Sequence, residues 1–359
     1  VTPFSAAETL PAILDVRMAA LKLDDDPNAV LVDDFGTVAE AFEFAQASEQ
    51  PVSSIVFSSK EYRLNSSTLA SATHLLELSY ISDLAIQGNG ASIVVLDPTV
   101  GLLSLRYCSN VTVSGLQIDY LPKPNSQGSV TAVDAASASV LVALDPAKDN
   151  PSIAMPHFRQ APIRWALIKD AANPRRQKPG LPNTLNVQAW RETAADRTFN
   201  VSLPPYVFAD FATAEGSIEV GDAFVQIARF NSASAFTVYS SALIAYEDIR
   251  IWTAPAASYT ALNCSGLAFR RVVTAPAAGR MQASGADGIY TVATRRPPPT
   301  GSDHADGASV TVEDSVLETV GDDGIILKTQ AMTLMTAPRQ PEIQLGGIVW
   351  LWHGLRVGD

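Results

Sequence analysis

Short runs of alternating apolar and polar residues recur along this chain and predict many short β-strands. The run at 83–88 (Asp-Leu-Ala-Ile-Gln-Gly) returns in similar form at 110–115 (Asn-Val-Thr-Val-Ser-Gly), 27 residues later. Runs at 243–248 and 267–272 recur after 24 residues, and Glu247-Asp248 returns as Glu313-Asp314 after 66, which predicts three coils of 22. Leucine-rich repeats share this period, but the Leu and Asn skeleton they need is missing. The pattern therefore predicts an all-β parallel β-helix, in which stacked coils bury an apolar face that no single coil could bury alone.

The first part of the predicted β-helix spans 31–121. It follows an N-terminal segment, 1–30, that has weak α-helical spacing and ends in acidic residues. We expect a short strand at 31–36, a helix over Ala39–Ala47 with Thr37 as its N-cap, and strands at 54–57 and 61–64. A helix at this place would cover the open end of the coil and its unpaired backbone groups.

Residues 122–229 interrupt the repeat and predict a small inserted β-rich domain. Runs at 127–134 and 139–144 resemble a hairpin, and 223–227 resembles a further strand. The Trp and Arg residues of the insert have two possible roles: they could line one wall of a groove, or they could occupy scattered surface and core positions. These residues are Arg164, Trp165, Arg175, Arg176, Trp190 and Arg191. The second part of the β-helix is expected over 230–359, with the pattern fading after 330.

Composition narrows the classes of partner. The chain is 47% hydrophobic and only 17% charged, with 23 Pro and 21 Gly, which suits short strands joined by turns. Its net charge of −12 argues against nucleic acid, anionic membranes and polyanionic substrates, and favours a neutral glycan. The chain contains no run of 18 or more apolar residues, so no membrane span is expected. Cys108 and Cys264 lie in apolar runs, and we expect buried free thiols rather than a bridge.

Two acidic clusters carry the candidate chemistry: Asp287, in Ala-Asp-Gly-Ile, and Asp322-Asp323, in Gly-Asp-Asp-Gly-Ile. They flank an alternating run at 308–317, so they lie about one coil apart and would become neighbours at the inter-strand spacing of about 4.8 Å. Consecutive aspartates on a regular strand face opposite sides, but Gly321 and Gly324 allow a bend that turns both outward. Three clustered carboxylates repel one another, so at least one is expected to have a raised pKa and to act as an acid. The alternative is that Asp-Gly is only turn chemistry at a corner.

These residues carry a family resemblance. The two acidic clusters resemble the carboxylate layout of inverting glycosidases with the pectin-lyase-like right-handed β-helix, namely the polygalacturonases and, more closely, the α-1,3-galactosidases of glycoside hydrolase family 110. The further matching segments lie at 110–113, 118–122, 127–128, 237–241 and 312–314. The resemblance implies Asp322 as general acid and Asp287 with Asp323 as the groups that activate water, with acid and base about 6.5 to 9.5 Å apart.

The resemblance also has departures. Lys328 stands where many relatives have histidine, and about ten residues, 295–304, are inserted between the clusters, so an inactive member of the family stays open. We expect Tyr290, Arg295 and Lys328 to contact substrate. No cofactor or metal is expected, although calcium at the three aspartates is an alternative. His304 with Asp303 and Asp306 indicates a mobile loop more than a metal site.

The sequence therefore predicts an inverting glycoside hydrolase that acts on a neutral glycan, which the resemblance suggests contains galactose. The expected partner is an oligo- or polysaccharide, and the expected location is extracellular or periplasmic, with no signal visible at the start of the chain. Two rival hypotheses are a non-catalytic glycan-binding β-helix and a calcium-dependent polysaccharide lyase.

Overall fold

The computed structural model describes residues 26–66, 73–209, 216–293 and 310–328, together with the backbone of the paired strands β26 (Met332–Leu334) and β27 (Leu345–Ile348). The described chain is mostly β, with parallel sheets, as the alternation predicts. Its helices are short, and they are η1 (Val32–Asp34), α1 (Val38–Ala47), α2 (Pro156–Gln160) and α3 (Tyr206–Ala209). No helix in the described ranges is long and apolar enough to cross a membrane.

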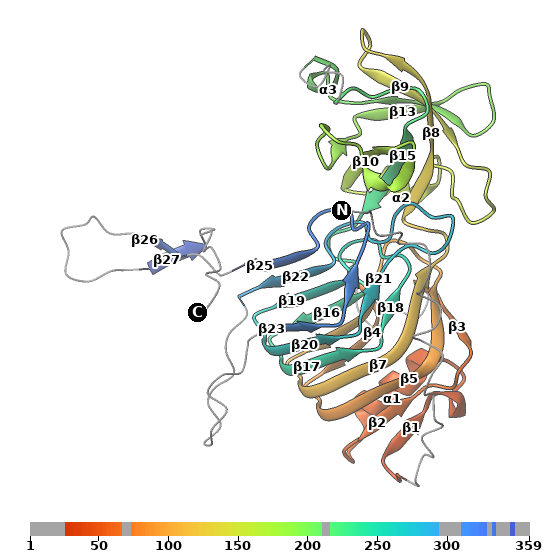
Figure 1. Cartoon of the computed structure of the whole chain (residues 1–359). Helices are drawn as coiled ribbons and strands as arrows, with labels where there is room; N and C mark the ends of the chain where they lie inside the picture. Colours follow the sequence, from red (N-terminus) through yellow and green to blue (C-terminus); the bar gives the residue numbers. More distant parts are fainter. Residues whose placement is uncertain are drawn as a thin grey trace, which may run out of the picture.

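One parallel sheet has six strands in the order β25-β22-β19-β16-β6-β4. Their bounds are β4 (His74–Ser79), β6 (Gly101–Arg106), β16 (Phe236–Tyr239), β19 (Tyr259–Leu262), β22 (Ile289–Val292) and β25 (Ile325–Lys328). Equivalent residues form straight columns across the sheet, because Phe236 aligns with Tyr259, Tyr259 with Ile289, and Ile289 with Ile325. Figure 1 shows these strands stacked from β4 to β25.

The second parallel sheet contains eleven strands and follows the first around the molecule. Its main path is β1 (Ala29–Leu31), β2 (Ser54–Val56), β5 (Ser82–Val95), β7 (Ser109–Tyr120), β17 (Ala242–Glu247), β20 (Ser265–Arg270) and β23 (Val310–Glu313). The register of β5 shifts between Gln87 and Ala91, so its second half belongs to a separate ladder. That ladder also contains β3 (Glu61–Leu64), β18 (Arg250–Ile251), β21 (Val273–Thr274) and β24 (Val316–Leu317).

The chain visits these ladders in a fixed cycle, and each turn adds one strand to each ladder. The runs at 83–88 and 110–115 were expected on neighbouring coils, and the pairing of Leu84 with Val111 confirms this. The predicted count of three coils between Glu247 and Glu313 is wrong: Glu247 pairs with Arg270, and Arg270 pairs with Glu313, so there are two turns. The second of these turns contains additional residues between β21 and β23, which a constant period could not anticipate.

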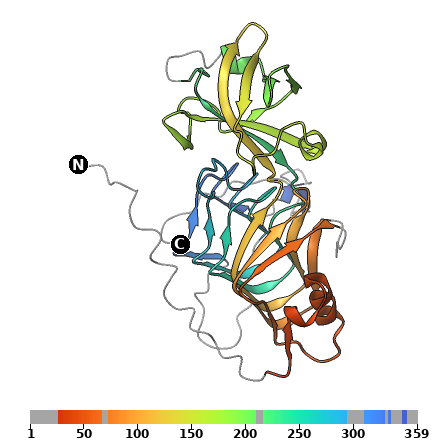
Figure 2. The same ribbon diagram turned by 90° about the vertical axis from the view of Figure 1, so that its right-hand side faces the viewer.

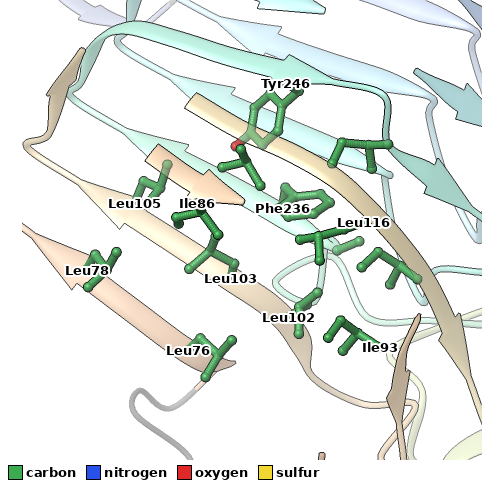
Figure 3. Packing of buried hydrophobic residues seen from close by; sticks show 14 of the residues in the cluster. Leu76, Leu78, Ile86, Ile93, Leu102, Leu103, Leu105, Leu116, Phe236 and Tyr246 are labelled. Atoms are coloured by element: carbon green, nitrogen blue, oxygen red, sulfur yellow. The ribbon is translucent and has the colours of Figure 1, made fainter. Parts of the chain in front are cut away.

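The interior between the ladders is apolar and ordered in columns. Leucines, isoleucines and valines fill it near β4, β5, β6 and β7, and Figure 3 shows leucines and isoleucines of these strands in one cluster with Phe236 and Tyr246. Farther along, the ring of Tyr246 stacks on Phe269 with centroids 5.5 Å apart, and it lies 5.0 Å from Tyr259. Aromatic pairs of this kind contribute about 0.5–1.5 kcal/mol beyond their buried area. Cys108 and Cys264 are both buried and free, as predicted.

Helix α1 lies at the β1 and β2 end of the coil, as the sequence predicts (Figure 1). Thr37 is its N-cap: the hydroxyl accepts from the Glu40 amide, and the Glu40 carboxylate accepts from the Thr37 amide. This capping box satisfies two backbone donors that the helix itself cannot. The strand expected at 31–36 is wrong apart from its first residue: β1 ends at Leu31, and the chain then turns into η1.

Residues between β7 and β16 form a separate antiparallel sheet in the order β11-β10-β15-β8-β9-β14-β13, with β12 paired to β10. The strands are β8 (Asn125–Asp134), β9 (Ser139–Leu144), β10 (Ile163–Asp170), β11 (Asn173–Gln177), β12 (Leu185–Asn186), β13 (Ala189–Glu192), β14 (Thr198–Ser202) and β15 (Ala223–Arg229). The expected hairpin is β8 with β9, in which Asp134 lies opposite Ser139. Figures 1 and 2 show this sheet standing off one side of the coil. The boundaries 122 and 229 stay a prediction.

The strand expected at 308–317 is broken. Strands β23 and β24 are separated by Asp314 and Ser315, and the φ of Asp314, 49°, lies in the left-handed region, so the chain turns a corner there. Residues 308 and 309 lie outside the described residues. The apolar and polar residues alternate on both sides of this corner. Alternation alone therefore cannot distinguish two strands joined by a corner from one straight strand.

Candidate functional site

The beginnings of β22 and β25 bring the two acidic clusters together. The Gly288 amide donates to the Asp323 carbonyl over 3.0 Å, and the Ile289 amide donates to the Gly324 carbonyl over 3.0 Å. Asp287 and Asp323 therefore occupy equivalent positions on neighbouring turns, as the stacking argument predicts. Asp322 lies one residue before this position.

Carboxylate oxygens of Asp287, Asp322 and Asp323, one from each residue, all lie within 4.8 Å of one another. A point between the three oxygens is then at most about 2.8 Å from each, which is hydrogen-bond distance for a water or a hydroxyl. These three aspartates are called the acidic trio below. Asp322 and Asp323 are both exposed, as the bend at Gly321 and Gly324 predicts, whereas Asp287 is only 3% exposed. Neighbouring turns cover Asp287 on both sides, while β25 has a parallel neighbour, among the described strands, on one side only.

Glycine permits the close backbone approach at this site. A Cβ on Gly288 would lie 2.5 Å from the Gly324 carbonyl oxygen, and one on Gly321 would lie 2.7 Å from the Gly285 oxygen. Any side chain at either position would push the two turns apart. The sequence had indicated Gly321 as a source of backbone freedom, whereas its role in the structure is steric.

Arg229, the last residue of β15, reaches the trio from the inserted sheet. Its Nη1 donates to Asp322 Oδ2 over 2.9 Å, and its Nε donates to Asn231 Oδ1 over 2.6 Å. The guanidinium carbon lies 4.5 Å from the ring centre of Trp165, so the cation also stacks on an aromatic face. Sequence reasoning missed Arg229, because its contact with Asp322 spans 93 residues. The available signal was weak: a cation placed where the chain re-enters the coil.

The environment of Asp287 favours its protonated form. Burial raises the pKa of Asp287, the nearby Asp322 carboxylate raises it further, and Arg229 opposes this rise. Oδ1 of Asp287 makes no hydrogen bond to any residue of the described chain. A buried carboxylate without that partner is costly when charged, so Asp287 keeps its proton to a higher pH than a free aspartate does.

The residues expected to contact substrate have mixed positions. Tyr290 and Lys328 come together on the outer face of the first sheet, with the Lys328 Nζ 4.8 Å from the Tyr290 ring centre. Arg295 lies outside the described residues, as do His304 and the rest of the segment 294–309. Whether Tyr290 and Lys328 touch substrate stays a prediction.

The Trp and Arg residues of the insert do not form one wall. Trp165 belongs to the trio's surroundings through Arg229, whereas Arg164 lies 5.5 Å from the Trp190 ring and Arg175 pairs with Glu318 over 3.2 Å. The alternative of scattered positions therefore describes most of this set, with Trp165 as the exception.

Two chemical uses fit the trio. Three carboxyl groups around one point can donate and accept protons on a bound water or sugar oxygen. Hard oxygen ligands at this spacing could also hold a divalent cation, although Ca²⁺ prefers 2.3–2.6 Å and Arg229 already places a positive charge on Asp322. The geometry therefore favours acid–base chemistry over a cation site.

Comparison with known proteins gives little beyond this geometry. No protein-family model matches the chain, and a search of curated proteins finds no match. A solved structure of a "putative glycosyl hydrolase" from Parabacteroides merdae ATCC 43184 aligns over 84% of this chain and 95% of its own, with 11% sequence identity and a TM-score of 0.33. A TM-score of that size establishes no common fold, so the site must be interpreted from its own residues.

Proposed function

We propose that this chain is a glycoside hydrolase, built on a right-handed parallel β-helix, whose acidic trio performs general acid–base catalysis. The observation that supports this most is the trio itself: one buried carboxyl group with a raised pKa next to two exposed ones, around a point at hydrogen-bond distance from all three. Pairs of carboxyl groups with different proton affinities are what cleavage of a glycosidic bond requires.

The environment favours a different order of roles from the one that the resemblance implies. Burial raises the pKa of Asp287, so Asp287 is the better source of the proton. Asp322 and Asp323 are exposed and can accept a proton from water. Arg229 orients Asp322 through the 2.9 Å contact, and it is in this sense a positioning residue.

The spacing bears on the stereochemical outcome. The nearest oxygens of the trio are closer than the roughly 6.5–9.5 Å between carboxyl groups that most inverting glycosidases use to hold water. Inversion stays the proposed outcome, because the point between the three oxygens can hold the attacking water. The anomer released in the first turnovers decides it.

The proposed substrate is a neutral oligo- or polysaccharide, with galactosides as the first to test. A net charge of −12 disfavours an anionic glycan. The proposed location is extracellular or periplasmic, where such glycans are found.

The test is a screen of nitrophenyl glycosides and neutral oligosaccharides, with NMR of the anomer first released. Asp287→Asn and Asp322→Asn are each expected to lower kcat by about 10²–10⁴-fold. Asp248→Asn is the matched control, because Asp248 is an exposed aspartate paired with Arg271. Hydrolysis that survives in both trio variants, or is lost equally in the control, would contradict the proposal.

A calcium-dependent lyase is the second candidate, because three carboxylate oxygens within 4.8 Å of one another could also hold a divalent cation. The lyase proposal predicts unsaturated products and loss of activity with chelator. The hydrolase proposal predicts saturated products and no effect of chelator. Glycan binding without any product would instead support the non-catalytic alternative.

A further inference from the structure

Two tyrosines occupy a strained corner of the coil. Tyr80 follows β4 and Tyr107 follows β6, and their φ angles of 60° and 55° lie in the left-handed region. The equivalent corner residues on the next turns are Ser240 and Asn263, with φ of 48° and 57°. Asparagine tolerates this conformation, whereas a bulky residue there is strained. Strain that persists at a surface position calls for a functional explanation.

The two rings form a stack that projects into solvent. Their centroids are 4.9 Å apart with an interplanar angle of 13°, and Tyr107 meets the Tyr239 ring edge-on at 5.7 Å. The side chain of Tyr80 is 76% exposed and that of Tyr107 is 45% exposed. Burial in the core therefore does not account for these rings. Stacking restrains each ring, which lowers the entropy that a ligand would lose on binding them.

Polar residues lie close to the stack along the chain. Three residues after the two tyrosines, the Asn110 side chain donates to Asp83 Oδ1 over 2.6 Å, and both residues are exposed. Immediately before Tyr107, Arg106 lies 3.8 Å from the Glu77 carboxylate. Aromatic faces next to fixed donors and acceptors match the apolar C–H face and the hydroxyl groups of a sugar ring.

The corner is separate from the acidic trio. Strands β6 and β22 are three positions apart in the first sheet, which corresponds to about 14 Å at the usual strand spacing. The tyrosines follow the ends of their strands, whereas the trio precedes the beginnings of β22 and β25. A ligand ring stacked on Tyr80 therefore does not occupy the trio.

We propose that the corner formed by Tyr80 and Tyr107 is a surface binding site for a neutral glycan, in which a pyranose ring stacks on the outer face of Tyr80 and its hydroxyls bind the flanking polar groups. The proposal does not depend on hydrolysis at the trio, since it concerns binding alone.

The test is affinity electrophoresis in gels that contain galactomannan, arabinogalactan or a soluble β-glucan. The variants are Tyr80→Asn and Tyr107→Asn, since asparagine suits the left-handed backbone and removes only the ring. Each is expected to weaken retardation at least tenfold, with thermal stability equal to or above that of the natural chain. Phe44→Ala is the control, because Phe44 is an exposed aromatic residue on α1 that also contacts one other ring, Phe35.

Three results would overturn the proposal. They are no retardation of the natural chain in any of the three gels, equal retardation of the natural chain and both Tyr variants, or loss of retardation in Phe44→Ala as well. A corner that serves as a protein interface would give the first of these together with self-association that Tyr80→Asn abolishes. The Tyr variants are expected to hydrolyse small nitrophenyl glycosides at the unchanged rate, so failure here is distinct from failure of the hydrolase proposal.

Discussion

Replacing Asp287 by Asn should stabilise this protein at neutral pH while it removes the proposed acid. The Asp287 side chain is 3% exposed, its Oδ1 has no hydrogen-bond partner in the described chain, and two further carboxyl groups lie within 4.8 Å. Asparagine has nearly the same shape and no charge, and its amide can donate to the neighbouring carboxylates. The substitution therefore relieves repulsion without opening a cavity.

The magnitude follows from the charges. Two like charges 4.8 Å apart repel by about 3.5 kcal/mol at an effective dielectric constant of 20. Asp322 is 38% exposed, so solvent screening reduces this to roughly 1–2 kcal/mol. The expected gain in the free energy of unfolding at pH 7 is therefore about 1–2 kcal/mol.

The pH dependence gives the sharper test. The pKa of Asp287 is raised in the folded state, so the folded protein binds its proton more tightly than the unfolded chain does. Stability due to this group is fully present below the unfolded pKa of about 3.9 and is lost as the pH rises through the folded pKa. The advantage of Asn should therefore appear between these two pKa values and be largest above both.

Urea unfolding of the natural chain and Asp287→Asn at pH 7 and near pH 3.5 measures both effects, with Asp248→Asn as control. A variant less stable than the natural chain at pH 7 would refute the reasoning. So would a stability difference that stays constant on acidification.

Three further predictions follow from other contacts. Arg229→Met should destabilise the fold by roughly 1–2 kcal/mol, because the ion pair and the ring contact are lost. It should also raise the pKa of Asp287 further, which carboxyl NMR titration would measure. The control Arg164→Met removes a contact with the Trp190 ring and should leave the pKa of Asp287 unchanged. Arg280→Met should cost about 2–4 kcal/mol in urea unfolding, because Arg280 is mostly buried between two carboxylates at 2.7 and 3.0 Å, whereas Arg271→Met, at an exposed pair, should cost under about 1 kcal/mol. Tyr246→Phe should raise the melting temperature, since its buried hydroxyl has no partner in the described chain and removing it saves about 1 kcal/mol.

Sequence patterns predicted part of the local structure and the stacking of the acidic clusters. Alternation identified the strands near 54–57 and 61–64 and the hairpin of β8 and β9, and Thr37 identified the start of α1 together with its capping residue. Asp287 and Asp323 were expected on adjoining turns, and the register of β22 with β25 places them there. These features depend on interactions between residues of one segment, or on a repeat that the chain displays directly.

Features that depend on the surroundings of a residue could not be predicted in this way. The burial of Asp287 depends on the turns above and below it, and its sequence neighbours resemble those of the exposed Asp323. Arg229 reaches Asp322 only because the inserted sheet folds back on the coil. The corner tyrosines likewise look like ordinary strand ends until the rings are seen to stack.

The inserted sheet leaves and rejoins the coil through strands that lie side by side, with Asn125 of β8 opposite Ile227 of β15. After the insert, β16 pairs directly with β6, so the ladder continues across the point of insertion. The coil can thus serve as a constant scaffold. Exchange of the insert would bring a different residue to the place of Arg229 while the aspartates stay in position. Chimeras made at these two strands offer a route to new selectivity without redesign of the carboxylates.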